Sequence, residues 1–271
     1  MTLVSTDRAV AQRLFLAREV ALRAGAVQRE RYETVLAIAS KSASIDLVTE
    51  VDRACEALIV EAIRATFPAD AILAEEGGVG AAEGALFRWV IDPLDGTTNF
   101  AHGFPRFCVS IGVERAGERT LGVVYDPLLD ERFETVRGCG AWLGSRRLAV
   151  SRETQFGRGL FATGFPYDVH TSDDDNLEAF AAVVKSARGI RRDGSAALDL
   201  CYVAAGRVDG YWERKLHAWD VAAGILLVEE AGGRVSDERG GPVDPSGREL
   251  VATNGSLHEA LIERIQRRGS R

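Results

Sequence analysis

The sequence predicts a layered α/β protein with two lobes, and three observations carry that prediction. Helical and extended hydrophobic patterns alternate along most of the 271 residues, as they do in layered architectures. A strand-rich stretch over residues 107–144 interrupts the alternation. The pattern changes again between Ser145 and Ser151 without a flexible linker. We therefore expect an α+β lobe over residues 1–147 and an α/β lobe over residues 148–271.

In the first lobe, apolar residues recur at helical spacing over residues 7–30 and predict an amphipathic helix. A second helix is expected from Thr49 to the residue before Pro68, because a residue that precedes proline disfavours the helical region. The segments "AILAEEGG" (71–78) and "LFRWVID" (86–92) predict short buried strands. Alternating β-branched and aromatic runs in the strand-rich stretch predict an antiparallel meander.

The second lobe returns to alternating elements. Strand patterns occupy residues 158–165, 189–192 and 209–213, and helical patterns occupy residues 176–187, 195–206 and 220–231. Gly232 and Gly233 end the last helix, since glycine favours the backbone conformation that terminates helices. This order of elements is typical of helices packed on a sheet.

Composition and charge exclude several classes of protein. Forty acidic and 33 basic residues give a net charge of -7, so the chain as a whole is a poor partner for nucleic acid or an anionic membrane. No apolar run approaches the roughly 18 to 20 residues of a membrane span. Charged residues near the N-terminus lie where a signal peptide would need an apolar stretch. The four cysteines are far apart and form no CxxC pair. We expect a cytoplasmic protein with reduced thiols.

The stretch "WVIDPLDGTTNF" (89–100) places two carboxylates where a predicted strand ends. Pro93 fixes one dihedral angle between Asp92 and Asp95 and removes a hydrogen-bond donor. Magnesium prefers oxygen ligands in a tight octahedron, and these carboxylates with the Leu94 carbonyl make a plausible partial shell. The same residue types also form ordinary solvated turns, so the stretch alone fits either interpretation.

The residues that follow suit an anion. Gly96 lets the backbone approach a ligand closely, and the amides of Gly96 and Thr97 could open a short helix whose N-terminus attracts negative charge.

Three further places carry acidic groups at the ends of apolar elements. Glu75 and Glu76 follow a buried strand pattern, Asp220 lies in the first turn of an apolar helix, and Asp46 precedes an apolar pair. Each has a structural alternative, a solvated edge for the glutamates and helix capping for the aspartates. Together they provide the carboxylates that two divalent ions about 4 Å apart need to clamp the oxygens of a phosphoryl displacement.

These motifs resemble the inositol monophosphatase family of lithium-sensitive, magnesium-dependent phosphomonoesterases. "WVIDPLDGTTNF" is similar to the first family signature and "WDVAAGILLVEEAGG" to the second. The segments "DLVTEVD", "ILAEEGG", "FPRFCVSIG", "GVVYDP" and "GSAALDLCYVAAGRVDGYWE" also resemble family segments in the expected order, so the similarity extends over most of the chain.

The resemblance implies a layered αβαβα sandwich, often assembled as a homodimer, that binds two or three magnesium ions. Most metal ligands would come from the first lobe, and the substrate-alcohol contacts and the last ligand from the second. The implied metal ligands are Glu75, Asp92, the Leu94 carbonyl, Asp95 and Asp220. The implied substrate contacts are Glu75, Asp95, Gly96, Thr97, Gly194, Ser195, Ala196, Glu213 and Asp220.

For catalysis, the resemblance implies that Thr97, paired with Glu75, orients the attacking water and that Asp46 supports that water through water on the metal. Beside Glu213, Arg214 and Lys215 could bind a second anionic group of the substrate or could be charged surface residues.

The expected reaction is hydrolysis of a small phosphate monoester by direct attack of a metal-activated water, with inositol monophosphate as the first choice of substrate. Fructose 1,6-bisphosphate, histidinol phosphate, a nucleotide 3'-phosphate and NADP are the alternatives. A haloacid-dehalogenase-type nucleophile is disfavoured, because Asp92 and Asp95 are three residues apart rather than two. A non-catalytic regulatory or RNA-associated protein on the same scaffold is the alternative from another class.

Overall fold

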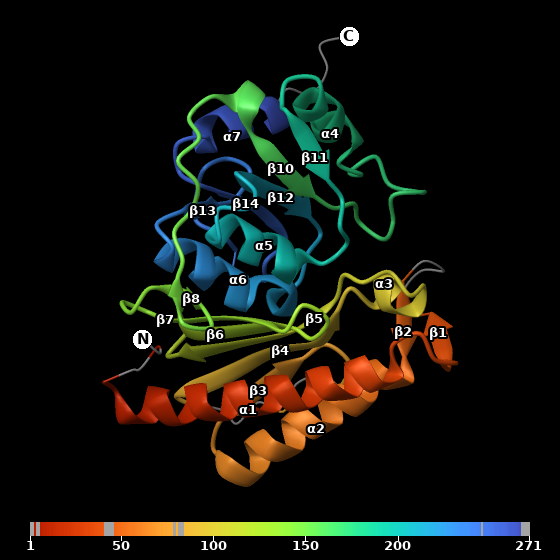
Figure 1. The fold of residues 1–271 in the computed structure, drawn as a ribbon, viewed down its shortest axis with the longest axis vertical. Helices are drawn as coiled ribbons and strands as arrows, with labels where there is room; N and C mark the ends of the chain where they lie inside the picture. Colours follow the sequence, from red (N-terminus) through yellow and green to blue (C-terminus); the bar gives the residue numbers. More distant parts are fainter. Residues whose placement is uncertain are drawn as a thin grey trace.

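The computed structural model describes residue 3 and residues 6–40, 46–77, 80, 84–244 and 246–266. These residues form five layers in the order helices, sheet, helices, sheet, helices (Figure 1). The predicted layered αβαβα class is confirmed.

The first layer consists of the two predicted helices, α1 (Arg8–Arg31) and α2 (Glu50–Thr66). Asp7 begins α1 by accepting hydrogen bonds from two backbone N–H groups of the first turn. Thr49 begins α2 in a capping box with Asp52. Both helices pack their buried apolar side chains against the first sheet, so the two periodicity predictions are confirmed.

The first sheet has seven strands in the order β3-β4-β5-β6-β7-β8-β9. Their bounds are β3 (Ala71–Ala74), β4 (Phe87–Asp95), β5 (Cys108–Arg115), β6 (Glu118–Asp126), β7 (Glu131–Val136), β8 (Ala141–Leu143) and β9 (Arg146–Arg147). β3 runs parallel to β4, and every later pair is antiparallel, which confirms the predicted meander. Gly78, at the end of the predicted strand segment 71–78, lies outside the described residues.

Strand β4 continues through Pro93 to Asp95, where the sequence predicted a loop. Asp92 pairs with Ser110 and Asp95 with Cys108, so two residues of β4 oppose one residue of β5. This β-bulge accommodates a proline that has no N–H to give to the ladder. Because Ser110 and Cys108 are two residues apart, Asp92 and Asp95 emerge on the same face of the sheet.

The middle layer consists of α5 (Ala196–Ala204) and α6 (Ala218–Glu230). Helix α6 lies directly on the first sheet, over Gly112 of β5 and its register partner Gly122 of β6. A Cβ atom on Gly112 would lie 2.9 Å from the Ala222 side chain, and one on Gly122 would lie 2.9 Å from Ala223 Cα. The two glycines therefore set the distance between helix and sheet.

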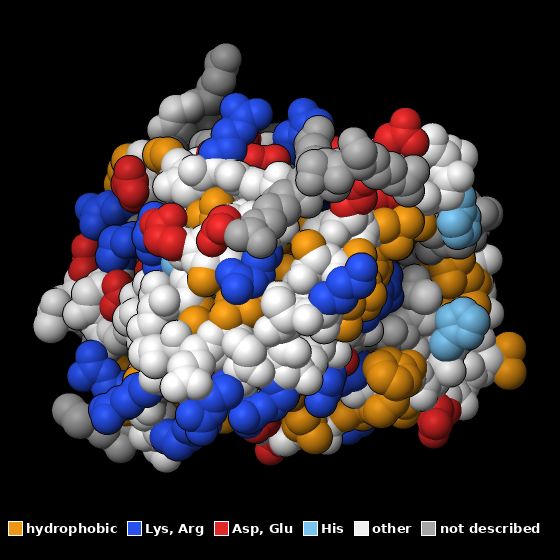
Figure 2. Space-filling model, turned by 90° about the horizontal axis from the view of Figure 1, so that it is seen from above, with side chains coloured by type: hydrophobic (Ala, Val, Ile, Leu, Met, Phe, Trp, Pro, Cys, Tyr) orange, Lys and Arg blue, Asp and Glu red, His pale blue; other side chains and the backbone are white. Residues whose placement is uncertain are grey.

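The second sheet has five strands in the order β11-β10-β12-β14-β13. Their bounds are β10 (Leu160–Thr163), β11 (Gly189–Arg191), β12 (Gly210–Arg214), β13 (Arg234–Ser236) and β14 (Glu249–Thr253). Helices α4 (Leu177–Val184) and α7 (His258–Gln266) cover its outer face. That end of the molecule mixes basic, acidic and apolar side chains (Figure 2).

The remaining short elements are β1 (Ile38–Ser40), β2 (Leu47–Thr49), α3 (Thr97–Ala101) and a 3₁₀ turn (Phe156–Arg158). The first sheet ends at Arg147 and the second begins at Leu160, but α6 of the second half packs on the first sheet. The division into lobes at residue 147 stays a prediction. Among the described residues, no helix has both the length and the apolar character that crossing a membrane requires.

Candidate active site

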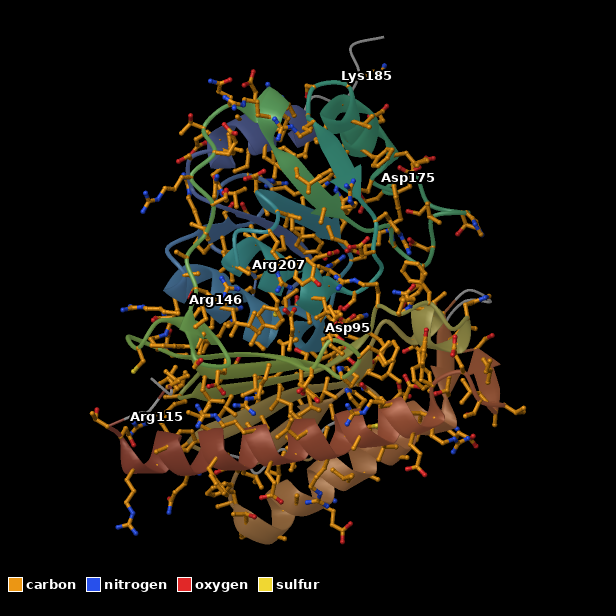
Figure 3. All side chains as sticks on the ribbon, in the orientation of Figure 1. Asp95, Arg115, Arg146, Asp175, Lys185 and Arg207 are labelled. Atoms are coloured by element: carbon orange, nitrogen blue, oxygen red, sulfur yellow. The ribbon has the colours of Figure 1, made fainter. Side chains whose placement is uncertain are left out.

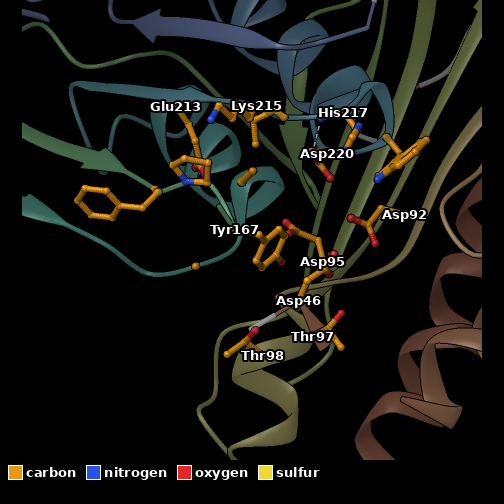
Figure 4. Close-up of a pocket in the computed structure, with 18 of the residues that line it drawn as sticks. Asp46, Asp92, Asp95, Thr97, Thr98, Tyr167, Glu213, Lys215, His217 and Asp220 are labelled. Carbon is orange, nitrogen blue, oxygen red and sulfur yellow. Dashed lines mark hydrogen bonds between the residues drawn. The ribbon is translucent and has the colours of Figure 1, made fainter. Parts of the chain in front are cut away.

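A pocket of about 440 Å³ brings together acidic residues that are far apart in the sequence. Eleven of the twelve residues predicted for the site line it: Asp46, Glu75, Asp92, Leu94, Asp95, Gly96, Thr97, Gly194, Ala196, Glu213 and Asp220. The twelfth, Ser195, is buried and donates a hydrogen bond to Asp95. Figure 4 shows the side chains of Asp92, Asp95 and Asp220 converging on one space.

The topology explains this convergence. Strands β3 and β4 are parallel neighbours, so their carboxyl ends meet at one edge of the sheet. Glu75 follows β3 directly, and Asp92 and Asp95 lie at the end of β4. Helix α6 begins above that edge and contributes Asp220 from its first turn.

Helix α5 fixes the Asp95 carboxylate, which lies between the first sheet and the middle layer (Figure 3). Asp95 Oδ2 accepts hydrogen bonds from Ser195 Oγ at 2.6 Å and from the Ala197 N–H at 2.8 Å. The hydrogen bonds from α5 thus use one carboxylate oxygen of Asp95.

Asp92 and Asp220 are each oriented by a backbone N–H group. The Leu94 N–H donates to Asp92 Oδ1 at 3.0 Å, and the His217 N–H donates to Asp220 Oδ2 at 2.7 Å. As for Asp95, these contacts hold one oxygen of each carboxylate and set the direction of the other.

The electrostatics of the pocket are those of repelling carboxylates. Burial raises the pKa of Asp92 well above its usual range, and the charges of Glu75, Asp95 and Asp220 raise it further. Burial, followed by the charge of Glu75, raises the pKa of Asp220 in the same way. Burial also raises the pKa of Asp95, against the hydrogen bonds from α5 that lower it. Such a group of acids is stable only when protons or cations neutralise it.

The donor set fits magnesium. Its members are carboxylate oxygens and one backbone carbonyl, which are the hard oxygen ligands that this ion prefers. In the described part of the chain, no three or more Asp, Glu, Cys or His side chains are already grouped as a closed metal site. Magnesium keeps several waters and is usually bound through one or two protein carboxylates, so an open arrangement is the expected one.

The Thr97 hydroxyl has a partner that the sequence did not reveal. Thr97 Oγ1 donates to Asp52 Oδ1 at 2.7 Å and lies 3.1 Å from the Leu94 carbonyl oxygen. Asp52 is fully buried, and its other oxygen accepts from both the N–H and the hydroxyl of Thr49. The predicted pairing of Thr97 with Glu75 stays a prediction.

Gly96 permits the turn from β4 into α3. Its φ of 98° is in the left-handed region, and a Cβ atom there would lie 2.7 Å from the Arg106 carbonyl oxygen. The backbone of Gly96 and Thr97 consequently lines the pocket directly.

At the opposite end of the pocket, β12 presents Glu213. The Tyr211 hydroxyl donates to Glu213 at 2.6 Å. Burial raises the pKa of Glu213 to about 7, although Tyr211 and the charge of Arg192 oppose the shift. A Cβ atom on Gly164 would lie 2.1 Å from the Glu213 carboxylate, so any larger residue there would force this carboxylate to move.

Protein carboxylates already pair with both basic residues beside Glu213. Arg214 pairs with Glu238 at 2.6 Å and Asp174 at 2.9 Å, and Lys215 pairs with Asp168 at 2.7 Å. Both line the pocket, yet their charges tie neighbouring loops together. This geometry favours the structural interpretation of the two residues over binding of a second substrate anion.

Comparisons with known proteins agree on one family. The family model described as the inositol monophosphatase family matches residues 10–270. An inositol-1-monophosphatase of Synechocystis sp. is 45% identical over 252 residues, which are 93% of this chain and 88% of the relative. A protein of Pseudomonas aeruginosa named Nus factor SuhB is 49% identical over 236 residues, 86% of this chain and 87% of the relative.

A solved structure gives the same result in three dimensions. The structure of inositol monophosphatase from Anabaena (Nostoc) sp. superposes with a TM-score of 0.86 at 43% identity. The match covers 96% of this chain and 97% of that chain, so all five layers are shared.

Proposed function

The chain belongs to the inositol monophosphatase family, and we propose that it hydrolyses inositol monophosphate in the pocket lined by Glu75, Asp92, Asp95 and Asp220. It is a phosphoric monoester hydrolase of a magnesium-dependent family. The observation that carries the substrate proposal is that Glu213 lines the same pocket as the cluster of buried carboxylates and is set apart from them (Figure 4).

Two or three magnesium ions would be held by Glu75, Asp92, the Leu94 carbonyl, Asp95 and Asp220. When bound, magnesium neutralises phosphate charge and lowers the pKa of water. The proposal includes inhibition of this chain by lithium, as the resemblance to the family implies.

The chain's own groups orient the reactants. The Thr97 hydroxyl donates its hydrogen bond to Asp52, which leaves the lone pairs of Oγ1 available to accept a hydrogen bond from the attacking water. Asp46 lines the same pocket and would support that water indirectly. The amides of Gly96 and Thr97 would hold the phosphate oxygens, and direct attack would leave no phosphorylated enzyme.

The alcohol end determines which ester is cleaved. Gly194, Ser195, Ala196 and Glu213 are the proposed contacts of the leaving alcohol, and an ionised Glu213 would accept hydrogen bonds from ring hydroxyls. Fructose 1,6-bisphosphate, histidinol phosphate, a nucleotide 3'-phosphate and NADP are the alternative esters. A panel of these esters, compared by kcat/KM, distinguishes among them.

The test is magnesium-dependent release of phosphate from inositol 1-phosphate, with lithium as an added inhibitor. We expect Asp92→Asn to lower kcat by at least about 10³-fold, because the variant removes a carboxylate from the centre of the cluster. Asp173→Asn, a change in an exposed loop, is the matched control and should keep parental kcat. An active Asp92→Asn enzyme would remove Asp92 from the site, and trapping an aspartyl-phosphate would contradict direct attack.

A regulatory, RNA-associated role is the second candidate, since several relatives are named Nus factor SuhB. The complete acid set supports catalysis in this chain. Absence of magnesium-dependent phosphate release from every ester of the panel would favour the regulatory role.

A cytoplasmic location and a homodimeric assembly complete the proposal. All four cysteines are free, which is consistent with a reducing compartment. Fractionation of cells and sedimentation of the purified chain test the two points.

A further inference from the structure

Helix α1 places one uncharged amide side chain in a buried face that is otherwise apolar except for Arg13. Gln28 is fully buried, in line with Val20, Ala21 and Ala24 on the side of the helix that faces the first sheet. A buried amide destabilises a fold unless hydrogen bonds compensate its lost hydration, and an apolar side chain of the same size avoids that cost. The position therefore requires an explanation beyond packing.

The partners of Gln28 lie at the β-bulge of β4. Gln28 Nε2 donates to the Pro93 carbonyl at 2.8 Å and approaches the Cys108 carbonyl at 3.4 Å. Pro93 is one of the two bulged residues, and Cys108 is the β5 residue paired with Asp95. The side-chain amide thus provides an N–H donor at the place where proline removes one from the ladder.

The bulge decides where the acidic groups point. Side chains alternate between faces along a regular strand, so residues 92 and 95 would lie on opposite faces without it. The extra residue brings Asp92 and Asp95 to one face and turns the intervening Leu94 carbonyl toward the pocket. A loosened bulge would displace all three groups together.

The side-chain oxygen of Gln28 indicates that this residue serves as a hydrogen-bond donor. Among the described residues, Gln28 Oε1 has no hydrogen-bond partner, although it is buried. A buried oxygen without a partner costs free energy. That the amide is present nonetheless indicates that the hydrogen bonds donated by its N–H group outweigh this cost.

We propose that Gln28 is a positioning residue, which holds the β4 bulge in the shape that presents Asp92, Asp95 and the Leu94 carbonyl to magnesium. This inference rests on the proposed function. It assigns a role in metal binding to a residue of α1 that touches neither metal nor substrate.

The experiment measures magnesium binding in the full-length chain, by calorimetric titration and by the magnesium-dependent rise in the melting temperature. Gln28→Met keeps the size and removes the donor. We expect its half-saturating magnesium concentration to rise about tenfold, the lower end of the loss caused by removing a group that orients a metal ligand. Its melting temperature without magnesium and its KM for inositol 1-phosphate at saturating magnesium should stay close to the parental values.

Val20→Ala is the matched control, because it opens the same buried helix face without touching the bulge. It should lower the melting temperature and leave magnesium binding unchanged. If Gln28→Met does not fold, Gln28→Asn, whose amide is one methylene too short to reach Pro93, replaces it with the same expected shift.

Parental magnesium binding in Gln28→Met, or an equal shift in Val20→Ala, would overturn the inference. If the parental chain binds magnesium and hydrolyses its ester, and the Gln28→Met variant does both equally well, only the role of Gln28 is refuted. A parental chain that binds no magnesium refutes the proposed function and this inference with it.

Discussion

At the scale of single residues, the Thr97 hydroxyl depends on a carboxylate from another element. One Asp52 oxygen accepts the hydrogen bond from the Thr97 hydroxyl, and the other accepts hydrogen bonds from Thr49. These hydrogen bonds are buried, so they restrict the orientation of the Thr97 hydroxyl. In the proposed mechanism, Asp52 accordingly positions Thr97 for the water that attacks phosphorus.

We predict that Asp52→Asn lowers kcat about 100-fold with little change in KM, because the hydroxyl loses its fixed acceptor while the phosphate contacts remain. Steady-state kinetics at saturating magnesium measure both constants. Glu50→Gln alters a partly exposed carboxylate in the same turn of α2 and is the control. A parental kcat in Asp52→Asn at a temperature where the variant is folded would show that the Asp52 contact does not serve catalysis.

The sequence predicted those pocket residues whose role can be inferred from their neighbours in the chain. Asp92 and Asp95 flank a proline in a short motif, and Glu75 directly follows a strand, so neighbouring residues reveal them. Asp52 and Gln28 were missed for one physical reason. Their partners lie 45 and 65 residues away, and the packing of α2 and α1 on the sheet brings them into contact. In the sequence alone, Asp52 fits a helix cap and Gln28 fits an ordinary helical residue.

At the scale of elements, α7 is joined to two strands of the second sheet by a buried histidine. His258 Nε2 lies 2.8 Å from Ser236 Oγ of β13, and Nδ1 lies 3.0 Å from Thr253 Oγ1 of β14. Burial lowers the pKa of His258 to about 4, and the nearby charge of Arg234 acts in the same direction. The histidine is therefore neutral in the folded protein at neutral pH.

The sign of the resulting pH dependence follows from the two protonation states. The unfolded chain takes up this proton near pH 6.5 and the folded chain only near pH 4, so the unfolded state binds more protons between these values. The contribution of neutral His258 to the free energy of unfolding is fully present above pH 6.5. It is lost as the pH falls to 4, by about 3 kcal/mol in total.

Urea denaturation of the parent and of His258→Gln at pH 7 and pH 5 measures this effect. The variant should be less stable at pH 7 but should lose less free energy of unfolding between the two pH values. Equal losses in the two proteins would show that other groups account for the acid sensitivity.

Periodicity predicted the long N-terminal elements, whereas the shorter ones were predicted only in part: β11 matches the strand expected over residues 189–192, but other short strands were missed. The two N-terminal helices and the meander contain enough residues to show a period. Strands β1, β2 and β13 have three residues each, too few to display alternation, and neither β14 nor α7 was predicted. The continuation of β4 through Pro93 was missed because proline usually ends a central strand, and only the bulge supported by α1 permits it here.

At the scale of the whole molecule, the distance between layers is part of the active site. Helix α6 carries Asp220, and the sheet beneath it carries Asp92 and Asp95. Gly112 and Gly122 let helix and sheet touch. A side chain at either position would move one set of carboxylates away from the other.

We predict that Gly122→Ala destabilises the protein by about 2 kcal/mol through overpacking, since the Cβ atom would meet the α6 backbone. The variant should also lower kcat/KM about 10-fold or more, because an ångström of displacement at a catalytic group is costly. Gly157→Ala, where the nearest atom to the new Cβ is 3.6 Å away, is the control and should change neither quantity. Melting curves and steady-state rates test the pair, and an unimpaired Gly122→Ala would mean that the layers adjust without disturbing the pocket.

The pocket draws its acids from residues 46 to 220, and the helix that brings the last of them lies between the two sheets. During synthesis, a growing polypeptide that has left the ribosome only as far as the first sheet exposes Glu75, Asp92 and Asp95 without their counterpart from α6. Such a fragment has no finished cavity in which to cut phosphate esters. A chain that ends before α6 therefore lacks Asp220 and is expected to be inert toward the esters that the complete pocket would cleave.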